Sequence, residues 1–496
     1  MQSIDSKGFE VVDPLIMALL FAGLIGIDGF ARTAGHEVWR PRGWAGTAIL
    51  LGAGSLVLAV CAVLTGAWIP SLVFALSLAT ILTIGSNIKR QVLGEPLVFT
   101  DLSLIGAMFR HPQFYLSALR LWQRIVLPLG IAALLGILVL FSTSDLAIRI
   151  AAACLAAASA VLLAALLRLS HWRYLSLSPD LDRDVRRHGL IATLLVYWSL
   201  WRRADLLQTC PTLPLRGEAN ELVIIIQCES FADPVALFSE LGEALPGLTR
   251  ARDISWQSGR LMVSGFGAYT MRTEFGVLFG IPEEALGVRR FDPFLTADSM
   301  TTWALPNRLD PEEWNTIFVH PHDMRFYGRD RLMPAAGFDT IVGEDAFDPP
   351  AANDGRYVTD AALCDKLLEL AQSREGSTLI YAVSIENHGP WAAESGGSAE
   401  GNTAGYMRLL KRSDAMLQRL IEALPRLQRS VVLCFFGDHR PSIPLVSAPG
   451  GERHTPYVVV RWQPDGSPVI GSESLRDLSP AELQTTILDA IGSRGG

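Results

Sequence analysis

The stretch VVLCFFGDHRP, residues 431–441, decides how the second half of this chain folds. Its first six residues are all apolar, which predicts a strand buried on both faces, because a half-exposed strand alternates apolar and polar side chains. Gly437, Asp438 and His439 follow directly. In open α/β sheets the C-terminal ends of strands face the ligand crevice. The stretch therefore predicts an α/β domain with a polar site at one edge of its sheet.

Other apolar runs of the same kind surround this stretch. They lie at 222–228, 316–320, 378–384 and 456–462, and they alternate with helical stretches such as 359–373 and 405–424. Continuous apolar strands separated by helices imply a mostly parallel sheet with helices on both faces. We expect this domain to occupy residues 219–496.

Acidic or imidazole side chains follow four of these strands. They are Glu229, His320, the segment Glu386-Asn387-His388, and Asp438 with His439. Four such strand ends in register suggest one common site. Carboxylates and imidazoles are ligands of first-row divalent metals, so we predict that Glu229, Asp438 and His439 bind one ion. The plainer alternative for Asp438 alone is a helix cap or a turn residue.

A second motif, GAYTMRTEFG at 267–276, places two threonines three residues apart. A threonine before a helical run is usually an N-cap. A threonine hydroxyl is a poor nucleophile unless a base or a metal activates it. Beside the predicted metal site, Thr270 is the expected nucleophile, and Thr273 with Glu274 begins the supporting helix.

The N-terminal part of the chain is strongly apolar. The mean hydropathy is +0.29, and residues 44–87 contain no Asp, Glu, Lys or Arg. A helix crosses the hydrocarbon core in about 20 residues, so this stretch predicts two spans folded at 68–71. Apolar runs at about 14–30, 125–144 and 150–167 predict three more. We expect a membrane domain of five helices over residues 1–168.

A linker is predicted over residues 169–218. Within it the apolar run 189–201 would reach only about 20 Å as a helix, which is too short to span. We expect an amphipathic helix lying along the membrane interface. No cleavable signal pattern precedes the first span.

Charge and cysteine content exclude some functions. The net charge of −8 argues against a nucleic-acid partner. The six cysteines show no paired spacing, and a Cys210–Cys364 bridge stays open.

Residues of about 220–490 resemble the catalytic domain of lipoteichoic acid synthases and related phosphoglycerol transferases, in the alkaline phosphatase and sulfatase superfamily. The resemblance rests on ES at 229–230, TxxxEF at 270–275, HPHDMRFYGRD at 320–330, ENHGPW at 386–391 and GDHRP at 437–441. The stretch SNIKRQVLGEPLVFTDL at 86–102 is similar to the family's loop between the spans and the catalytic region.

The resemblance implies roles for individual residues. Glu229, Thr270, Asp438 and His439 would be ligands of one divalent ion, expected to be Mn²⁺ or Mg²⁺, with Zn²⁺ as the alternative. Thr270 would be the nucleophile. The substrate phosphate would be bound by His320, Arg329 and His388 in a pocket lined by Phe326 and Tyr327.

The implied reaction moves glycerol phosphate from phosphatidylglycerol to a glycan or glycolipid through a phosphoglyceryl-threonine. Two alternatives stay open. One is a phosphoethanolamine transferase acting on lipid A or glycans, and the other is a membrane sensor with a degenerate domain.

The resemblance also implies a multi-pass protein of the cytoplasmic membrane with an external catalytic domain. The distribution of basic residues conflicts with this side. Thirteen Lys and Arg lie in 31–43, 88–124 and 168–187, whereas Lys7 and Arg149 lie on the other side. The positive-inside rule places the thirteen in the cytoplasm. A sixth crossing at 189–201 would reconcile the two, but that segment is short.

Overall fold

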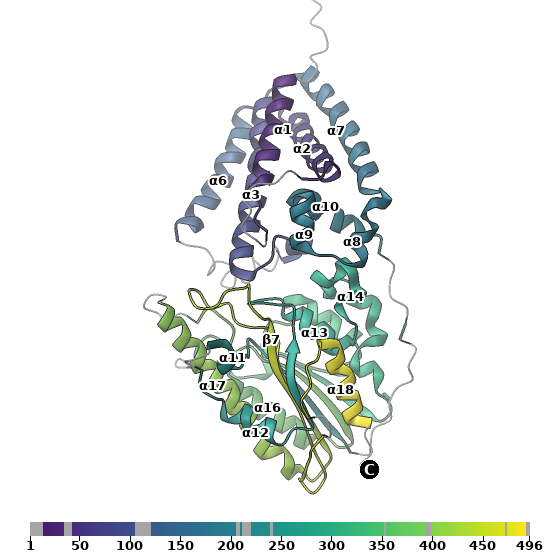
Figure 1. Cartoon of the computed structure of the whole chain (residues 1–496), viewed down its shortest axis with the longest axis vertical. Coiled ribbons are helices and arrows are strands. Elements are labelled where there is room, and N and C mark those ends of the chain that lie inside the picture. The colour runs from purple at the N-terminus through teal and green to yellow at the C-terminus, as the bar shows by residue number, and fades with distance from the viewer. Residues whose placement is uncertain are drawn as a thin grey trace, which may run out of the picture. The chain divides into compact units, whose positions relative to one another are not determined.

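The protein divides into two compact units in a computed structural model, one of residues 1–204 and one of residues 205–496. The structure describes residues 13–33, 42–104, 121–204, 209–210, 220–238, 242–351, 354–391, 398–471 and 474–492. Figure 1 shows the helical unit and the α/β unit. We describe each unit by itself.

Each of the five predicted spans coincides with a helix of the first unit. These helices are α1 (Pro14–Gly29), α2 (Trp44–Thr65), α3 (Trp68–Leu93), α6 (Leu121–Leu140) and α7 (Leu146–Leu167). Among the described residues, α2, α3 and α7 are long and apolar enough to cross a membrane, while α1 and the Pro128–Leu140 part of α6 are shorter. The turn between α2 and α3 lies at Gly66, where φ is +68°, close to the predicted bend.

Three short helices follow α7 and pack within the same unit. They are α8 (Arg173–Leu177), α9 (Leu181–His188) and α10 (Leu190–Trp201). The carboxylate of Asp28, in α1, accepts a hydrogen bond of 2.8 Å from the Leu190 backbone N–H and pairs with Arg42 at 3.0 Å. A buried carboxylate thus holds the N-terminus of α10 against α1. The structure groups residues up to Ala204 with the spans, and the interfacial position of α10 stays a prediction.

The second unit is built on an eight-stranded mixed sheet. Its strands are β1 (Leu222–Cys228), β2 (Gln257–Met262), β3 (Trp314–Val319), β4 (Thr340–Val342), β5 (Ser377–Val383), β6 (Val431–Gly437), β7 (His454–Trp462) and β8 (Pro468–Val469). The order is β2-β7-β6-β1-β5-β3-β4, with β8 on β7. The strands from β6 to β4 are parallel, and β7 runs antiparallel to its neighbours. The predicted sheet is confirmed, and β2, β4 and β8 are added to it.

The register of the parallel strands brings their C-terminal ends level. Cys228 pairs with Gly437, Gln227 with Val383, and Val319 with Ala382. The residues that follow these strands therefore emerge at one edge of the sheet, which we call the catalytic edge.

Helices cover both faces of this sheet. The helices α12 (Pro246–Asp253), α16 (Asp360–Ser373) and α17 (Ala399–Ala423) share one apolar core with β1 and β6. The helices α13 (Thr270–Phe279) and α18 (Pro480–Gly492) pack together on the other face (Figure 1).

Two contacts fit α18 closely against α13. An added Cβ at Gly276 would lie 2.5 Å from Cβ of Pro480, so only glycine permits the approach. Gln484 donates a hydrogen bond of 2.7 Å to the backbone carbonyl of Leu278. Helix α13 is thus supported from behind by a segment far away in sequence.

The six cysteines, all within the described residues, are free thiols. Cys228, Cys364 and Cys434 are buried. The Cys210–Cys364 bridge left open by the sequence is not formed.

Candidate active site

Two carboxylates and one imidazole meet at the catalytic edge. Glu229 follows β1, and Asp438 and His439 follow β6. One ligand atom from each residue lies within 4.8 Å of the other two, and all three side chains are buried. We call these residues, together with Thr270, the carboxylate corner. The predicted metal ligands are therefore brought together.

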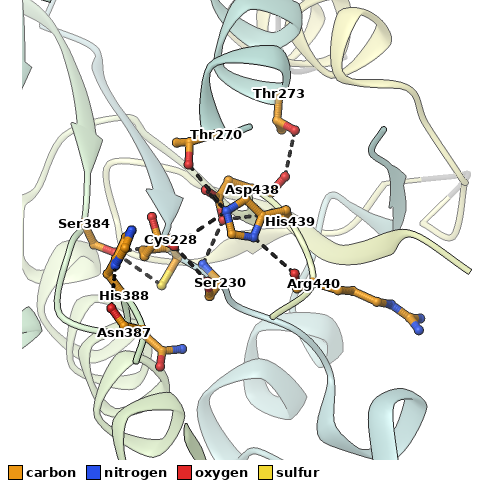
Figure 2. A network of polar contacts seen from close by, with 12 residues as sticks. Cys228, Ser230, Thr270, Thr273, Ser384, Asn387, His388, Asp438, His439 and Arg440 are labelled. Carbon is orange, nitrogen blue, oxygen red and sulfur yellow. Dashed lines mark hydrogen bonds and ion pairs between the residues drawn. The ribbon is translucent and has the colours of Figure 1, made fainter. Parts of the chain in front are cut away.

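Backbone groups orient the two ligands that follow β6. The N–H groups of Ser230 and His439 each donate to Asp438 Oδ1 at 2.8 Å. His439 Nδ1 lies 3.2 Å from the Arg440 carbonyl, and a proton on Nδ1 leaves the lone pair of Nε2 facing the corner. That Nε2 lies 3.4 Å from Asp438 (Figure 2). It lies 3.7 Å from Glu229.

The electrostatics of the corner favour a cation. Burial and the charge of Asp438 raise the pKa of Glu229. Asp438 Oδ2 is buried and has no hydrogen-bond partner among the described residues, although such atoms are normally satisfied. Oxygen and nitrogen donors of this kind suit a divalent first-row ion. The residues present therefore fit the predicted metal, and its identity stays a prediction.

Thr270 faces this corner from the first position of α13. Its Oγ1 lies 3.5 Å from His439 Nε2 (Figure 2). The N-cap position belongs to Tyr269, whose φ is +76°, so the interpretation of Thr270 as a cap is wrong. Backbone N–H groups at a helix N-terminus favour a bound anion, which suits a phosphate beside Thr270.

The turn before α13 is held in a conformation that is uncommon for a bulky residue. Tyr269 adopts the left-handed region, and the Arg272 guanidinium lies 3.9 Å from the centre of its ring. One turn later Thr273 donates a 2.7 Å hydrogen bond to the Asp438 carbonyl. The Thr273 hydroxyl thus ties the helix to the predicted metal ligand Asp438, and the expectation that Thr273 is not the nucleophile stays a prediction.

A second group on the same edge consists of Glu274, His320 and Arg329, which we call the arginine corner. Glu274 accepts two hydrogen bonds from Arg329, from Nε at 3.0 Å and from Nη2 at 2.5 Å. Arg329 Nη1 lies 3.4 Å from His320 Nε2, and His320 Nδ1 lies 2.9 Å from the Val383 carbonyl. All three side chains are buried.

The positive charge of Arg329 in the arginine corner is neutralised within the protein. Burial and the neighbouring Arg329 charge lower the pKa of His320 well below its usual range, so the ring is neutral and its Nε2 accepts from Arg329. Glu274 neutralises the guanidinium that we expected to grip a phosphate. The predicted substrate role of His320 and Arg329 stays a prediction, and the Glu274 ion pair was not predicted from the sequence.

The remaining predicted substrate residues lie around these corners. Tyr327, with φ +61°, places its ring 5.3 Å from the Arg329 guanidinium. His388 Nδ1 lies 2.8 Å from the Gly389 carbonyl, and desolvation lowers the pKa of His388. The Tyr357 ring lies 6.0 Å from the His388 ring and 5.8 Å from the His322 ring.

A cavity of about 590 Å³ opens beyond His322. Its walls combine carboxylates with apolar side chains and include His322, Asp323, Glu344, Asp345, Phe347 and Val358. Because His322 contacts both His320 and Tyr357, the cavity adjoins the predicted substrate residues.

Comparison with known proteins places this geometry in a family. The sequence profile of the sulfatase family matches residues 221–493. The chain is 29% identical over 404 residues to the capsular polysaccharide biosynthesis protein RkpI of Rhizobium meliloti (strain 1021), covering 76% of this chain and 74% of that protein. It is 25% identical over 325 residues to a protein of the same organism named for cyclic β-1,2-glucan modification, covering 58% of this chain but only 49% of that protein.

One solved structure is similar over nearly the whole length. It is the integral membrane lipooligosaccharide phosphoethanolamine transferase A (EptA) from Neisseria meningitidis, at a TM-score of 0.51 and 12% identity. The match covers 96% of this chain and 93% of that chain. The fold, apolar helices followed by an alkaline-phosphatase-like domain, is therefore shared.

Proposed function

Because the chain belongs to the sulfatase family, we propose that it is a membrane-bound phosphotransferase that uses Thr270 as its nucleophile. The observation that carries the proposal is the carboxylate corner. There the Thr270 hydroxyl lies 3.5 Å from His439 Nε2, beside a buried Asp438 oxygen that lacks a partner among the described residues. A degenerate sensor domain would have no need to keep these groups together.

The chain's own residues account for the binding of the metal and the phosphate. Glu229, Asp438 and His439 would hold one divalent ion, with Thr270 at its side. Such an ion lowers the pKa of a hydroxyl and offsets charge on a phosphate. Thr270 is the first residue of α13, and the N-terminus of a helix favours a bound anion, so a donor phosphate would be stabilised beside Thr270.

The transfer then takes two balanced steps. Thr270 Oγ1 forms a bond to phosphorus while the bond from phosphorus to the diacylglycerol oxygen breaks, and the diacylglycerol leaves with a proton. An acceptor hydroxyl next forms a bond to the same phosphorus, and the Thr270 oxygen leaves and regains a proton. His388, half-buried and neutral, is suited to accept the proton of the acceptor.

We propose phosphatidylglycerol as the donor and a glycan or glycolipid as the acceptor. The donor follows from the resemblance of five motifs to phosphoglycerol transferases. The names of the two relatives, which concern a capsular polysaccharide and a β-1,2-glucan, support a glycan acceptor. The cavity beyond His322 is large enough for sugar units, since ligand pockets typically span 300–1,000 Å³.

A phosphoethanolamine transferase is the second candidate. The fold match to EptA over almost the whole chain favours it. Both candidates use the same carboxylate corner, so the head group of the donor separates them.

We place the protein in the cytoplasmic membrane, with the α/β unit on the outer side where such acceptors are found. The thirteen basic residues argue for the opposite orientation. Labelling of Cys210 from outside intact cells, in a variant with the other five cysteines replaced, tests the side.

The function is tested with full-length protein in nanodiscs that contain Mn²⁺ and either head-group-labelled phosphatidylglycerol or head-group-labelled phosphatidylethanolamine. We expect glycerol phosphate on the peptide that contains Thr270, found by mass spectrometry, and no adduct in Thr270→Ala. Ethanolamine phosphate on this peptide would select the second candidate. An unmodified Thr270 peptide with both donors, in protein that holds the metal, would exclude the covalent mechanism.

A further inference from the structure

An exposed apolar tip lies on the loop that leaves the sheet after the metal ligands. This loop, residues 440–453, joins β6 to β7. Leu445 is 81% exposed and Val446 is 36% exposed, and we call these two residues the apolar tip. Isolated exposed apolar residues are common, so exposure alone carries no conclusion.

The base of the loop is rigidly held. Ser447 Oγ donates to the Pro441 carbonyl at 2.8 Å and accepts from the Ile443 N–H at 2.6 Å. The Ile443 side chain is fully buried in the core, and Asn402 of α17 donates to the Pro444 carbonyl at 3.2 Å. These bonds fix the direction in which the apolar tip points.

The backbone of the tip is strained. Leu445 has a φ of +68°, a region that disfavours residues with a Cβ. Leu445 is therefore unfavourable twice, in its backbone and in its contact with water. Unfavourable conformations of this kind concentrate at functional positions.

The base of this loop lies close in space to the turn that precedes the proposed nucleophile, although the two segments are far apart in the sequence. The Gly267 N–H donates to the Arg440 carbonyl at 2.8 Å, and a Cβ at Gly267 would lie 2.3 Å from Ser442 Cβ. Figure 2 shows the Arg440 side chain directed away from Thr270. The base of the loop therefore packs on the turn that leads into α13.

We infer that Leu445 and Val446 insert into the interfacial layer of a lipid bilayer and bring the catalytic edge to the head groups. The chain itself carries helices long enough to cross a membrane. An apolar side chain that is strained and wet in solution gains by burial in the interface.

The chain offers a matched control residue. Leu475 is also 81% exposed, but it pairs with Ser258 of β2, the strand at one end of the sheet and two strands away from β6. Its φ is not positive. The inference therefore predicts that Leu445 contacts lipid and Leu475 contacts water, although the two leucines are equally exposed.

The experiment uses full-length protein in nanodiscs, with Cys154 and Cys210 replaced by serine because the other four cysteines are mostly or fully buried. Leu445→Cys or Leu475→Cys then carries an environment-sensitive fluorophore. We expect quenching by nitroxide-labelled lipids at position 445 and by aqueous iodide at position 475. Equal quenching by iodide at both positions overturns the inference. Protection from both quenchers at position 445 overturns it as well, because a protein would then cover the tip.

A second measurement separates this inference from the proposed function. Leu445→Gly removes the side chain and relieves the strain, so the melting temperature should not fall. Turnover with a bilayer-embedded donor should fall about tenfold, the partition ratio of one leucine side chain, while turnover with a short-chain soluble donor stays unchanged. Equal turnover of Leu445→Gly and wild type on bilayer donors overturns the inference. If transfer fails with every donor, the proposed function is wrong, and the quenching result still decides the position of the tip.

Discussion

The carboxylate corner and the arginine corner lie on the same edge of one sheet, but they differ in electrostatics. The first holds buried acids beside an imidazole, whereas the second pairs its acid with an arginine. In the carboxylate corner two buried acids lie close together, and Asp438 Oδ2 has no hydrogen-bond partner among the described residues. In the arginine corner Glu274 binds Arg329 through two hydrogen bonds, and His320 completes the group. The first corner leaves a buried acceptor oxygen open to a ligand, whereas the charges of the second are already paired within the protein. Strand-end motifs alone do not distinguish these two cases.

The largest expected effect is the fall in transfer rate when the proposed nucleophile of the carboxylate corner is removed. Thr270→Ala should lower the transfer rate at least about 10⁴-fold, because it removes the hydroxyl that would form the covalent intermediate. Thr273→Ala, the matched control, loses only a hydrogen bond to the Asp438 carbonyl and should cost at most about tenfold. Initial rates at saturating donor measure both. Similar losses for the two variants would contradict the assignment of Thr270.

Removal of the metal tests whether the carboxylate corner depends on a cation. We expect Mn²⁺ at a thousandfold excess over its Kd to stabilise the wild type by about 4 kcal/mol, and a chelator to reverse this. The gain should shrink as the pH falls, because the raised pKa of Glu229 makes the ion compete with a proton.

The control for this effect is an acid outside the corner. Asp438→Asn should abolish the stabilisation seen in thermal denaturation, while Asp233→Asn, which removes a partly exposed ion pair with Arg252, should keep it. Equal stabilisation of both variants would place the ion elsewhere.

The stability contributed by the arginine corner should depend on the Glu274–Arg329 ion pair and not on a metal ion. Glu274→Gln leaves a buried guanidinium without its counter-ion and should cost about 3 kcal/mol. The double variant Glu274→Leu with Arg329→Met removes both charges and should recover most of that loss. Thermal denaturation of the full-length protein measures both. A double variant as unstable as the single one would show that the pair is not self-compensated.

The smallest expected effect, taken over a single pH unit, concerns Asp360, which lies outside both corners. Burial and the neighbouring Glu386 raise the pKa of Asp360. A carboxyl with a raised folded pKa contributes stability at low pH and loses it as the pH rises through that pKa. The free energy of unfolding of the wild type should therefore fall by up to about 1.4 kcal/mol per pH unit as the pH rises towards the pKa of Asp360. The free energy of unfolding of Asp360→Asn should not fall in this way. If the melting temperatures of the wild type and Asp360→Asn changed with pH in the same way, Asp360 would not be protonated in the folded protein.

The sequence predicts the strands and the residues at the catalytic edge better than it predicts the side-chain pairs that hold them. Apolar strand runs predicted β1, β3, β5, β6 and β7, and the polar residues that follow them identified Glu229, Asp438 and His439. The short strands β4 and β8 carry too few residues to show a pattern, and β2 (QSGRLM) is polar at half of its positions.

Long-range pairs explain the remaining gaps. Glu274 and Arg329 are 55 residues apart, and Asp28 lies 162 residues from the Leu190 N–H that it accepts. A single sequence contains no local signal for such pairs. The same limit applies to Arg329, whose motif predicted a phosphate ligand, whereas the structure pairs the side chain with an internal acid.

The support of α13 by α18 has a consequence for the biogenesis of the protein. The hydrogen bond between Gln484 and Leu278 joins residues 206 positions apart. At about 5–20 residues per second, a ribosome needs roughly 10–40 s to bridge that interval. Until then α13 lacks its contact with α18, so the surroundings of Thr270 are completed only when nearly all of the second unit has been synthesised.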